Sequence, residues 1–364
     1  MEMHNNPINA NKGEWSEFYT LLKLLSDGKL YAADHNLNKI SEIFYPVLKV
    51  ITSKDSPLEN QFDISKDDNS IFISTSGKEV GSVGREFIKS KTRKILVGIK
   101  NLPDDTTIMV VAQEILQKLH LSTIKASHTK KSDISLVIHD RVTGTTPEVG
   151  FSIKSMLGGA STLLNVSGAT EIKYKIIGNI INAESVNSID SRSKYRDRIK
   201  HIYEHGAELE FVRLTNHIFE SNLRKVDSLM PYILAESVKM YFQGIASKIT
   251  ENVLHLEAIN PLKGYFNPPA DFYEFKMKNL LLYSALGMMP ATNWDGLLEA
   301  HGGYIIVKED GELACFHIYN LDNFRQYLYL NTSYDTPSSR WNFGNIYEEE
   351  GQQYINLNFQ IRFN

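Results

Sequence analysis

The sequence is poor in cysteine, because Cys315 is the only one in 364 residues. A single thiol can form neither an intramolecular disulfide nor a cysteine-based metal site, and unpaired cysteine is typical of a reducing compartment. The sequence also lacks an apolar run of about 18 residues, the length that a membrane-spanning helix needs. Its first residues, M-E-M-H-N-N-P-I-N-A, lack the basic and then apolar pattern of a secretory leader. We therefore expect a cytoplasmic protein with no membrane partner.

The chain also lacks a strong charge of one sign, since 39 Lys and Arg residues face 43 Asp and Glu residues and the formal net charge is −4. Nucleic-acid-binding proteins are often strongly basic, but local clusters can supply phosphate contacts in a chain of low net charge. Two basic clusters are present, and they hold Arg192, Lys194, Arg196, Arg198 and Lys200 in one case and Lys125, His128, Lys130 and Lys131 in the other. We interpret both clusters as candidate contacts to a phosphate backbone.

The length allows two domains or one elaborated domain, and 42% hydrophobic with 23% charged residues is ordinary for a globular protein. A polar segment near residues 180–192 is the best candidate for a boundary. We therefore expect one domain over residues 1–185 and a second, helical and then strand-rich, over residues 186–364.

Hydrophobic periodicity predicts a mixed α/β fold. The predicted helices cover residues 11–26, 36–50, 85–99 and 106–120, with a short helix from about residue 161 and a mostly helical region over 190–250. The predicted strands cover residues 70–74, 123–126, 134–139, 148–154, 171–177, 304–307, 313–319 and 354–363. Asn11 followed by Glu14 predicts a reciprocal cap at the start of the first helix.

The stretch T-P-E-V-G-F-S-I-K-S at residues 146–155 alternates like a half-buried strand, with Ser152 and Lys154 together on its polar face. Turn residues fill the preceding segment, 140–147. This pattern predicts an antiparallel hairpin with the strand over residues 134–139.

Such a hairpin would bring Asp133, at the start of its first strand, to the same sheet edge as Lys154, at the end of its second. A carboxylate can hold a divalent cation, and a lysine beside it can orient and polarise a water molecule. These are the minimal requirements for hydrolysing a phosphodiester. The same spacing is equally compatible with an Asp–Lys pair on the protein surface, which contributes little to stability.

Six phrases are spread along the chain from near residue 10 to its end. They are N-K-G-E-W-S-E-F-Y (11–19), D-G-K-L-Y-A-A-D (27–34), G-F-S-I-K-S-M-L-G-G-A-S-T-L-L-N (150–165), G-G-Y-I-I-V-K-E-D-G (302–311), T-P-S-S-R (336–340) and L-N-F-Q-I-R-F (357–363). In this order they resemble type II restriction endonucleases of the HpaII family. Asp133 on one expected strand and Ser152-Ile153-Lys154 on the next also resemble the PD-(D/E)xK nuclease core.

The resemblance implies a Mg²⁺-dependent type II restriction endonuclease that cleaves double-stranded DNA at a short palindrome of the C-C-G-G kind. It implies a DNA methyltransferase as genetic partner, and a palindrome is most simply cut by a homodimer. The implied fold is a mixed sheet flanked by helices, with recognition elements in the C-terminal region. Asp133 would bind the metal and Lys154 would be the catalytic lysine.

The sequence departs from the PD-(D/E)xK pattern at Ser152, which stands where an acid usually precedes x-Lys. A hydroxyl cannot replace the charge of a carboxylate, so a second metal-binding acid has to come from elsewhere. We favour Glu17, on the predicted first helix. Glu14 is expected to be occupied in the helix cap, and Glu171 is a further alternative.

For DNA recognition, the segment with Ser338, Ser339 and Arg340 is the most suggestive one. Arg pairs with guanine through two hydrogen bonds, and Ser can bond to several base edges. The same segment could equally be a rigid surface loop.

Two other functions fit parts of the sequence. His201, Glu204 and His205 match the H-x-x-E-H pattern of a zinc peptidase. A non-catalytic DNA-binding protein is the other alternative. Asp295 and Lys308 form a second Asp–Lys combination, but the Lys308 position is explained more simply as the end of a solvated hairpin.

Overall fold

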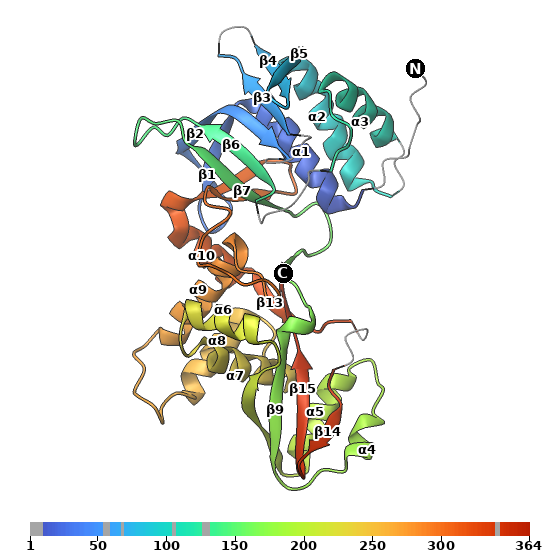
Figure 1. Cartoon of the computed structure of the whole chain (residues 1–364), viewed down its shortest axis with the longest axis vertical. Helices are drawn as coiled ribbons and strands as arrows, with labels where there is room; N and C mark the ends of the chain where they lie inside the picture. Colours follow the sequence, from blue (N-terminus) through green and yellow to red (C-terminus); the bar gives the residue numbers. More distant parts are fainter. Residues whose placement is uncertain (1–9, 54–58, 67–68, 104–106, 126–131, 339–342) are drawn as a thin grey trace. The chain divides into compact units, whose positions relative to one another are not determined.

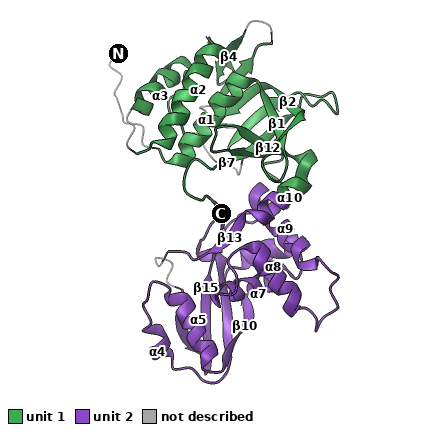
Figure 2. Cartoon of the chain, turned by 180° about the vertical axis from the view of Figure 1, so that it is seen from behind, with its two compact units in different colours: residues 1–161, 298–324 green, residues 162–297, 325–364 purple. Residues whose placement is uncertain are grey.

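The computed structural model describes residues 10–53, 59–66, 69–103, 107–125, 132–338 and 343–364. Two compact units make up the chain, the first from residues 1–161 and 298–324 and the second from residues 162–297 and 325–364 (Figure 2). The second unit therefore interrupts the sequence of the first. The boundary expected near residue 185 lies inside the second unit, within helix α4 (Ala183–Asn187).

The first unit is built on a nine-stranded sheet. Its strands are β1 (Lys29–Ala33), β2 (Lys39–Thr52), β3 (Asn60–Ile64), β4 (Ser70–Thr75), β5 (Lys78–Gly84), β6 (Ile134–Ile138), β7 (Glu148–Ser155), β11 (Gly303–Val307) and β12 (Leu313–His317). Their order is β1-β12-β11-β7-β6-β2-β3-β4-β5, and β1 pairs with β2 as well. That additional pairing closes six strands into a ring in which β7 and β6 are neighbours. A strand inside a closed ring is paired on both sides and has no free edge, so its neighbours hold it in place.

Three helices of the first unit, α1 (Lys12–Asp27), α2 (Arg85–Lys100) and α3 (Thr107–Lys118), lie side by side (Figure 1). Helix α1 contacts strands β2 and β7 on the sheet as well as α2. Trp15 and Leu22 on this helix are fully buried. Its predicted cap is confirmed, because Asn11 and Glu14 form a reciprocal capping box and Gly28 ends the helix with φ of 63°.

The expectation of a helix over residues 36–50 is wrong, because this region belongs to strand β2. Pro46 inside the segment has no backbone N–H to continue a helix. The strand pairs with β1, β3 and β6, which bury Tyr45 and Val47. These partners are distant in sequence, so a local pattern could not reveal them.

Two other local expectations are also wrong. Residues 123–125, the described part of a predicted strand, lie outside any strand. The helix expected from about residue 161 is instead the short strand β8 (Thr162–Leu164), which pairs with β16 (Gln360–Phe363). Strand β9 (Glu171–Gly178) is present as predicted but belongs to a sheet of the second unit. The elements expected between residues 106 and 177 therefore do not belong to one sheet.

The second unit contains two smaller sheets and further helices. Its other strands are β10 (Ala207–Leu214), β13 (Thr332–Asp335), β14 (Ile346–Glu349) and β15 (Gln352–Asn358). Its other helices are α5 (Lys194–Glu204), α6 (His217–Val226), α7 (Met230–Phe242), α8 (Ile249–Ile259) and α9 (Phe272–Leu286). Helix α10 (Leu321–Leu330) begins in the first unit and ends in the second. One sheet has the order β10-β9-β15-β14 and the other β13-β16-β8. A mixed α/β fold is thus confirmed. Among the helices of the described residues, none has both the length and the apolar character needed to cross a membrane.

Replacing Gly303 by Ala should destabilise the first unit strongly. Gly303 opens β11 with φ of +119°, and a Cβ there would lie 1.9 Å from the carbonyl oxygen of Phe316 on β12. Relieving this contact requires the β11–β12 pair to separate, so we expect a loss of about 3 kcal/mol in the free energy of unfolding.

Gly77→Ala is the matched control for this change. Its φ is +76°, but no heavy atom lies within 4 Å of the added Cβ. The control should lose only about 1 to 2 kcal/mol, the usual penalty for a left-handed conformation. Urea unfolding followed by circular dichroism compares the two, and equal losses would contradict the proposed backbone contact.

Candidate active site

The hairpin expected around Asp133 and Lys154 is present. Strands β6 and β7 pair in antiparallel fashion with Ile134 opposite Phe151, and the backbone N–H of Asp133 donates to the Phe151 carbonyl at 2.8 Å. This register sets Asp133 beside Ser152 at one end of the hairpin, and Lys154 follows two residues later on β7.

One carboxylate oxygen of Asp133 is held by β7. Its Oδ2 accepts a hydrogen bond from the backbone N–H of Ile153 at 2.6 Å and another from the Ser152 hydroxyl at 3.1 Å. Ser152 is 2% exposed, so this hydroxyl is shielded from competing water. Hydrogen bonds to a charged acceptor are stronger than those between neutral groups. The carboxylate of Asp133 is therefore fixed in orientation by the strand that carries Lys154.

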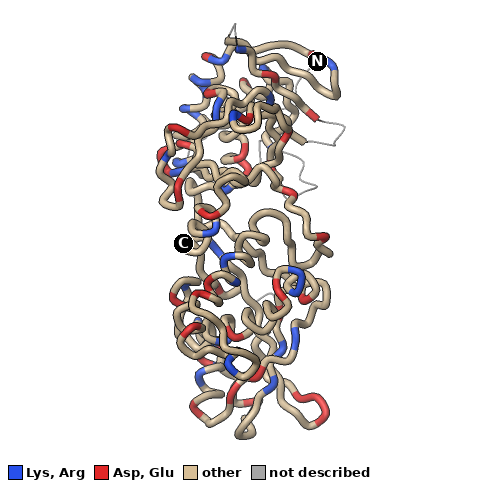
Figure 3. The backbone as a smooth tube through the Cα atoms, turned by 90° about the vertical axis from the view of Figure 1, so that its left-hand side faces the viewer, with Lys and Arg blue, Asp and Glu red and all other residues tan. Residues whose placement is uncertain are grey.

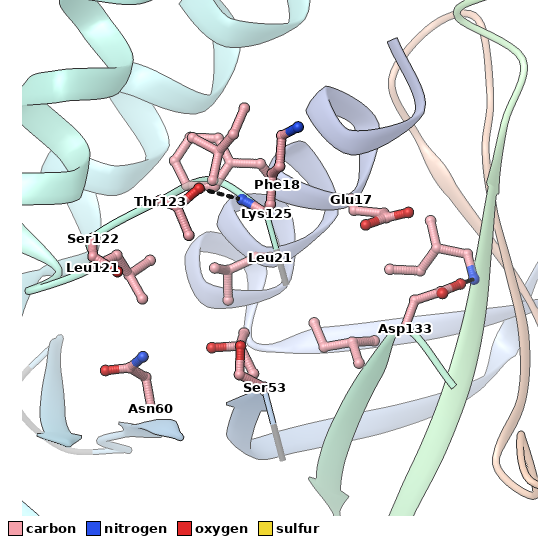
Figure 4. Close-up of a pocket in the computed structure, with 14 residues that line it drawn as sticks. Glu17, Phe18, Leu21, Ser53, Asn60, Leu121, Ser122, Thr123, Lys125 and Asp133 are labelled. Carbon is pink, nitrogen blue, oxygen red and sulfur yellow. Dashed lines mark hydrogen bonds between the residues drawn. The ribbon is translucent and has the colours of Figure 1, made fainter. Parts of the chain in front are cut away.

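A cavity of about 150 Å³ adjoins Asp133. Its wall includes Glu17 and Phe18 of α1, and Figure 4 shows the Glu17 and Asp133 carboxylates on neighbouring walls. The remaining lining residues are Leu21, Thr52, Ser53, Asn60, Leu121, Ser122, Thr123, Ile124, Lys125, Ile134 and Ile153. The structure thus brings together two acids that are 116 positions apart in the sequence (133 minus 17).

Lys154 lines a second cavity, of about 170 Å³. Glu17 and Ile153 line both cavities and so stand between Asp133 on one side and Lys154 on the other. The other residues around the second cavity are Lys12, Gly13, Ser16, Ser155, Gly158, Gly159 and Ser161. Sequence reasoning did not single out Lys12. The available signal was its place on the first helix, one turn before Ser16, which is the neighbour of Glu17.

Glu14 is occupied by other contacts, as expected. Its Oε2 accepts from the backbone N–H of Asn11 at 2.8 Å, and its Oε1 pairs with Lys125 at 3.0 Å. Glu171 lies in β9 of the second unit, where burial raises the pKa of its carboxyl group despite hydrogen bonds to Thr215 and Asn356. A raised pKa disfavours the charged form that a metal requires. Of the three acids considered, Glu17 is the one that shares a cavity with Asp133.

The zinc-peptidase pattern does not form a metal site. The rings of His201 and His205 stack with centroids 4.0 Å apart, and the His205 Nδ1 lies 2.8 Å from the His201 carbonyl oxygen. Glu204 pairs with Lys200 at 3.7 Å. Across the described part of the chain, no group of three or more His, Cys, Asp or Glu residues could hold a metal ion.

The basic cluster around residues 192–200 serves different purposes at different positions. Arg192 is exposed, whereas Lys194 pairs with Asp190 at 2.8 Å. Arg196 lies over the ring of Tyr241, with its guanidinium carbon 4.7 Å from the ring centroid. Contact of these three residues with DNA remains a prediction.

Arg198 differs from these three residues in its surroundings. It is 5% exposed and donates hydrogen bonds to the carbonyl oxygens of Asn187, Ile189 and Gly344 and to the side chain of Asn345. A buried guanidinium with these four acceptors joins segments of the second unit and is shielded from a DNA phosphate.

The remaining predictions concern other DNA contacts and the second Asp–Lys combination. Lys130, Lys131, Ser339 and Arg340 lie outside the described residues, while Ser338 is exposed. Lys308 pairs with Asp310 at 3.5 Å in the turn between β11 and β12, as expected for a hairpin end. The side chain of Asp295 accepts from the backbone N–H of Leu297, so it takes part in a local turn.

Comparison with known proteins bears on the whole chain. The model of the HpaII restriction endonuclease family matches residues 11–363. The type II restriction enzyme HpaII of Haemophilus parainfluenzae is 40% identical over 358 residues, which cover 98% of this chain and 99% of that protein. No solved structure matches the chain. With a family match over nearly its full length and a relative of this identity, the chain belongs to the HpaII restriction endonuclease family.

Proposed function

We propose that this restriction endonuclease hydrolyses the backbone of double-stranded DNA at an active site formed by Asp133, Glu17 and Lys154. Membership of the family makes the chain a type II site-specific endonuclease. The observation that supports these residues is that Asp133 and Glu17 line one cavity, while Glu17 and Lys154 line the next. Hydrolysis of a phosphodiester is favoured by a metal ion held by carboxylates and by a positively charged side chain, because both stabilise the charge that develops in the transition state.

The pair of carboxylates fits Mg²⁺, which is commonly held by one or two carboxylates together with water molecules and substrate phosphate oxygens. When bound, the ion would neutralise charge that develops on the phosphate and make a bound water more acidic. Asp133 would supply an oriented oxygen, because the Ile153 N–H and the Ser152 hydroxyl fix the plane of its carboxylate. Glu17 would supply the second negative charge from α1.

Ser152 takes a positioning role in this proposal. It stands where the PD-(D/E)xK pattern has an acid, but its hydroxyl donates to Asp133. A hydrogen-bond donor cannot be a charged metal ligand. The acid that the pattern lacks on β7 is instead provided by Glu17, so the charge of the site is preserved by a different element.

Lys154 would orient the attacking water and stabilise the phosphate. The water oxygen forms a bond to phosphorus in line with the departing oxygen and releases its proton to solvent. The bond between phosphorus and the departing oxygen breaks with its electron pair on that oxygen, which takes up a proton from solvent to become a hydroxyl group. The ammonium group favours the added negative charge of the transition state. Its place at the end of β7, inside the closed ring of strands, keeps it in position for this step.

The proposed target is of the C-C-G-G kind, as the resemblance in the sequence implies, and a palindrome is most simply cut by a homodimer. A DNA methyltransferase as genetic partner would protect the host from such an enzyme. Ser338 and the exposed Arg192 are candidates for contact with DNA outside the cleavage site.

Asp133→Ala and Lys154→Ala should each lower DNA cleavage by at least about a hundredfold, because each removes a charge that the transition state needs. The measurement is digestion of phage DNA in Mg²⁺, with a gel-shift assay on the same samples. Wild-type protein should give discrete fragments, and both variants should still retard the DNA. Normal cutting by either variant would refute its assignment, and DNA that wild-type protein binds but leaves uncut would indicate a non-catalytic binding protein.

Glu17→Gln should also be inactive, because it removes the second carboxylate while keeping the size of the side chain. Glu14→Gln is the matched control on the same helix, since glutamine can take the place of glutamate in a capping box. We expect at least about a hundredfold slower cleavage for the first variant and nearly normal cleavage for the second. Near-normal activity of Glu17→Gln would transfer the role to another acid.

Sequencing the ends of the fragments should place every cut in a C-C-G-G site. Prior treatment of the DNA with a cytosine methyltransferase of that specificity should protect it, because the added methyl group occupies the major-groove edge of the cytosine. Cuts at unrelated sequences would leave the family membership intact and refute the proposed target.

A further inference from the structure

The second cavity contains more positive charge than the proposed mechanism uses. Lys12 is the first residue of α1, and Lys154 is near the end of β7, so two unrelated elements direct lysines to one space of about 170 Å³. Among the described residues that line it, Glu17 is the only acid, and the proposed metal site already employs it. Lys12 therefore has no assigned task.

Both ammonium groups lack an anionic partner in the part of the chain that the structure describes, where no hydrogen bond or ion pair involves the Nζ of Lys12 or of Lys154. Two like charges that border the same space repel each other, and the repulsion is stronger where the surroundings are less polar than water. An anion placed between them would remove this repulsion. The cavity has room for a group of several atoms, since a single water needs only about 15 Å³.

Apart from Ile153, the remaining wall is made of glycine and serine residues. Gly158 lies close to Lys12, because a Cβ added there would lie 3.3 Å from the Cβ of Lys12. The stem of Lys12 thus lies against the backbone that follows β7. The glycines and the serines Ser155 and Ser161 leave the space open, and their backbone and hydroxyl groups can donate to an anion.

We propose that this cavity binds a backbone phosphate of the DNA strand that is cut, with Lys12 as a phosphate contact beside Lys154. The inference rests on the proposed active site, because Glu17 is common to the two cavities and sets the phosphate next to the metal-binding acids. The ligand class is a phosphodiester, since it carries one negative charge per group and accepts hydrogen bonds through two oxygens. Lys12 would bind DNA of any sequence, because a phosphate carries no base information.

The test is the salt dependence of DNA binding, measured with the cleavage-deficient Asp133→Ala protein so that the DNA stays intact. Adding Lys12→Ala should lower the slope of log affinity against log salt by about 0.9 and weaken binding about fivefold to tenfold near 0.1 M salt, for specific and unrelated DNA alike. Lys12→Arg should keep the slope. Lys78→Ala, which removes an exposed lysine at the start of β5, is the control for a general change in charge.

An unchanged slope with Lys12→Ala would overturn the inference, and so would a decrease of the same size with Lys78→Ala. If Lys12→Ala fails to fold, Gly158→Ala tests the same site, because its methyl crowds the Lys12 stem and should weaken binding. Its control is Gly264→Ala, whose added Cβ meets no heavy atom within 4 Å; equal affinities of the two glycine variants would overturn the inference. Failure here is distinct from failure of the active site, which shows as cleavage by Asp133→Ala itself.

Discussion

The candidate active site depends on one interaction, the anchoring of the Asp133 carboxylate on strand β7. The Ile153 N–H and the Ser152 hydroxyl that hold it belong to the same strand as Lys154. The acid and the lysine are therefore positioned by one continuous backbone. Because side chains alternate along a strand, a shift of one residue between β6 and β7 would turn Ser152 and Lys154 to the other face and separate them from Asp133.

The closed ring of strands makes such a shift difficult. Strand β7 lies between β6 and β11, and the β7–β11 pair is parallel. Parallel neighbours need a crossover connection, and here that connection contains residues 162–297 of the second unit. The strand that stabilises β7 thus comes from a part of the sequence that follows most of the second unit. In the sequence, this long insertion follows β7 and precedes β11.

The sequence allows some of this arrangement to be predicted, where short-range chemistry decides it. The cap formed by Asn11 and Glu14 and the β6–β7 hairpin involve neighbours in sequence, and the structure has both. Strand β2 could not be predicted, because its partners β1, β3 and β6 override the local helical pattern. Glu17 was selected by resemblance and by exclusion of Glu14, whereas its presence in both cavities follows from the packing of α1 on β7.

The serine at position 152 also has a physical consequence for the proposed site. A carboxylate there would face Asp133 at hydrogen-bond distance from a position that is 2% exposed, and two negative charges so close repel strongly without a cation between them. Ser152 turns this repulsion into a hydrogen bond that orients Asp133. In the proposed site Glu17 would carry the displaced charge on α1, where it borders the space of Lys154 as well. Under this proposal, the exchange of acid for serine separates two tasks that one glutamate would combine, orienting the aspartate and supplying the second charge.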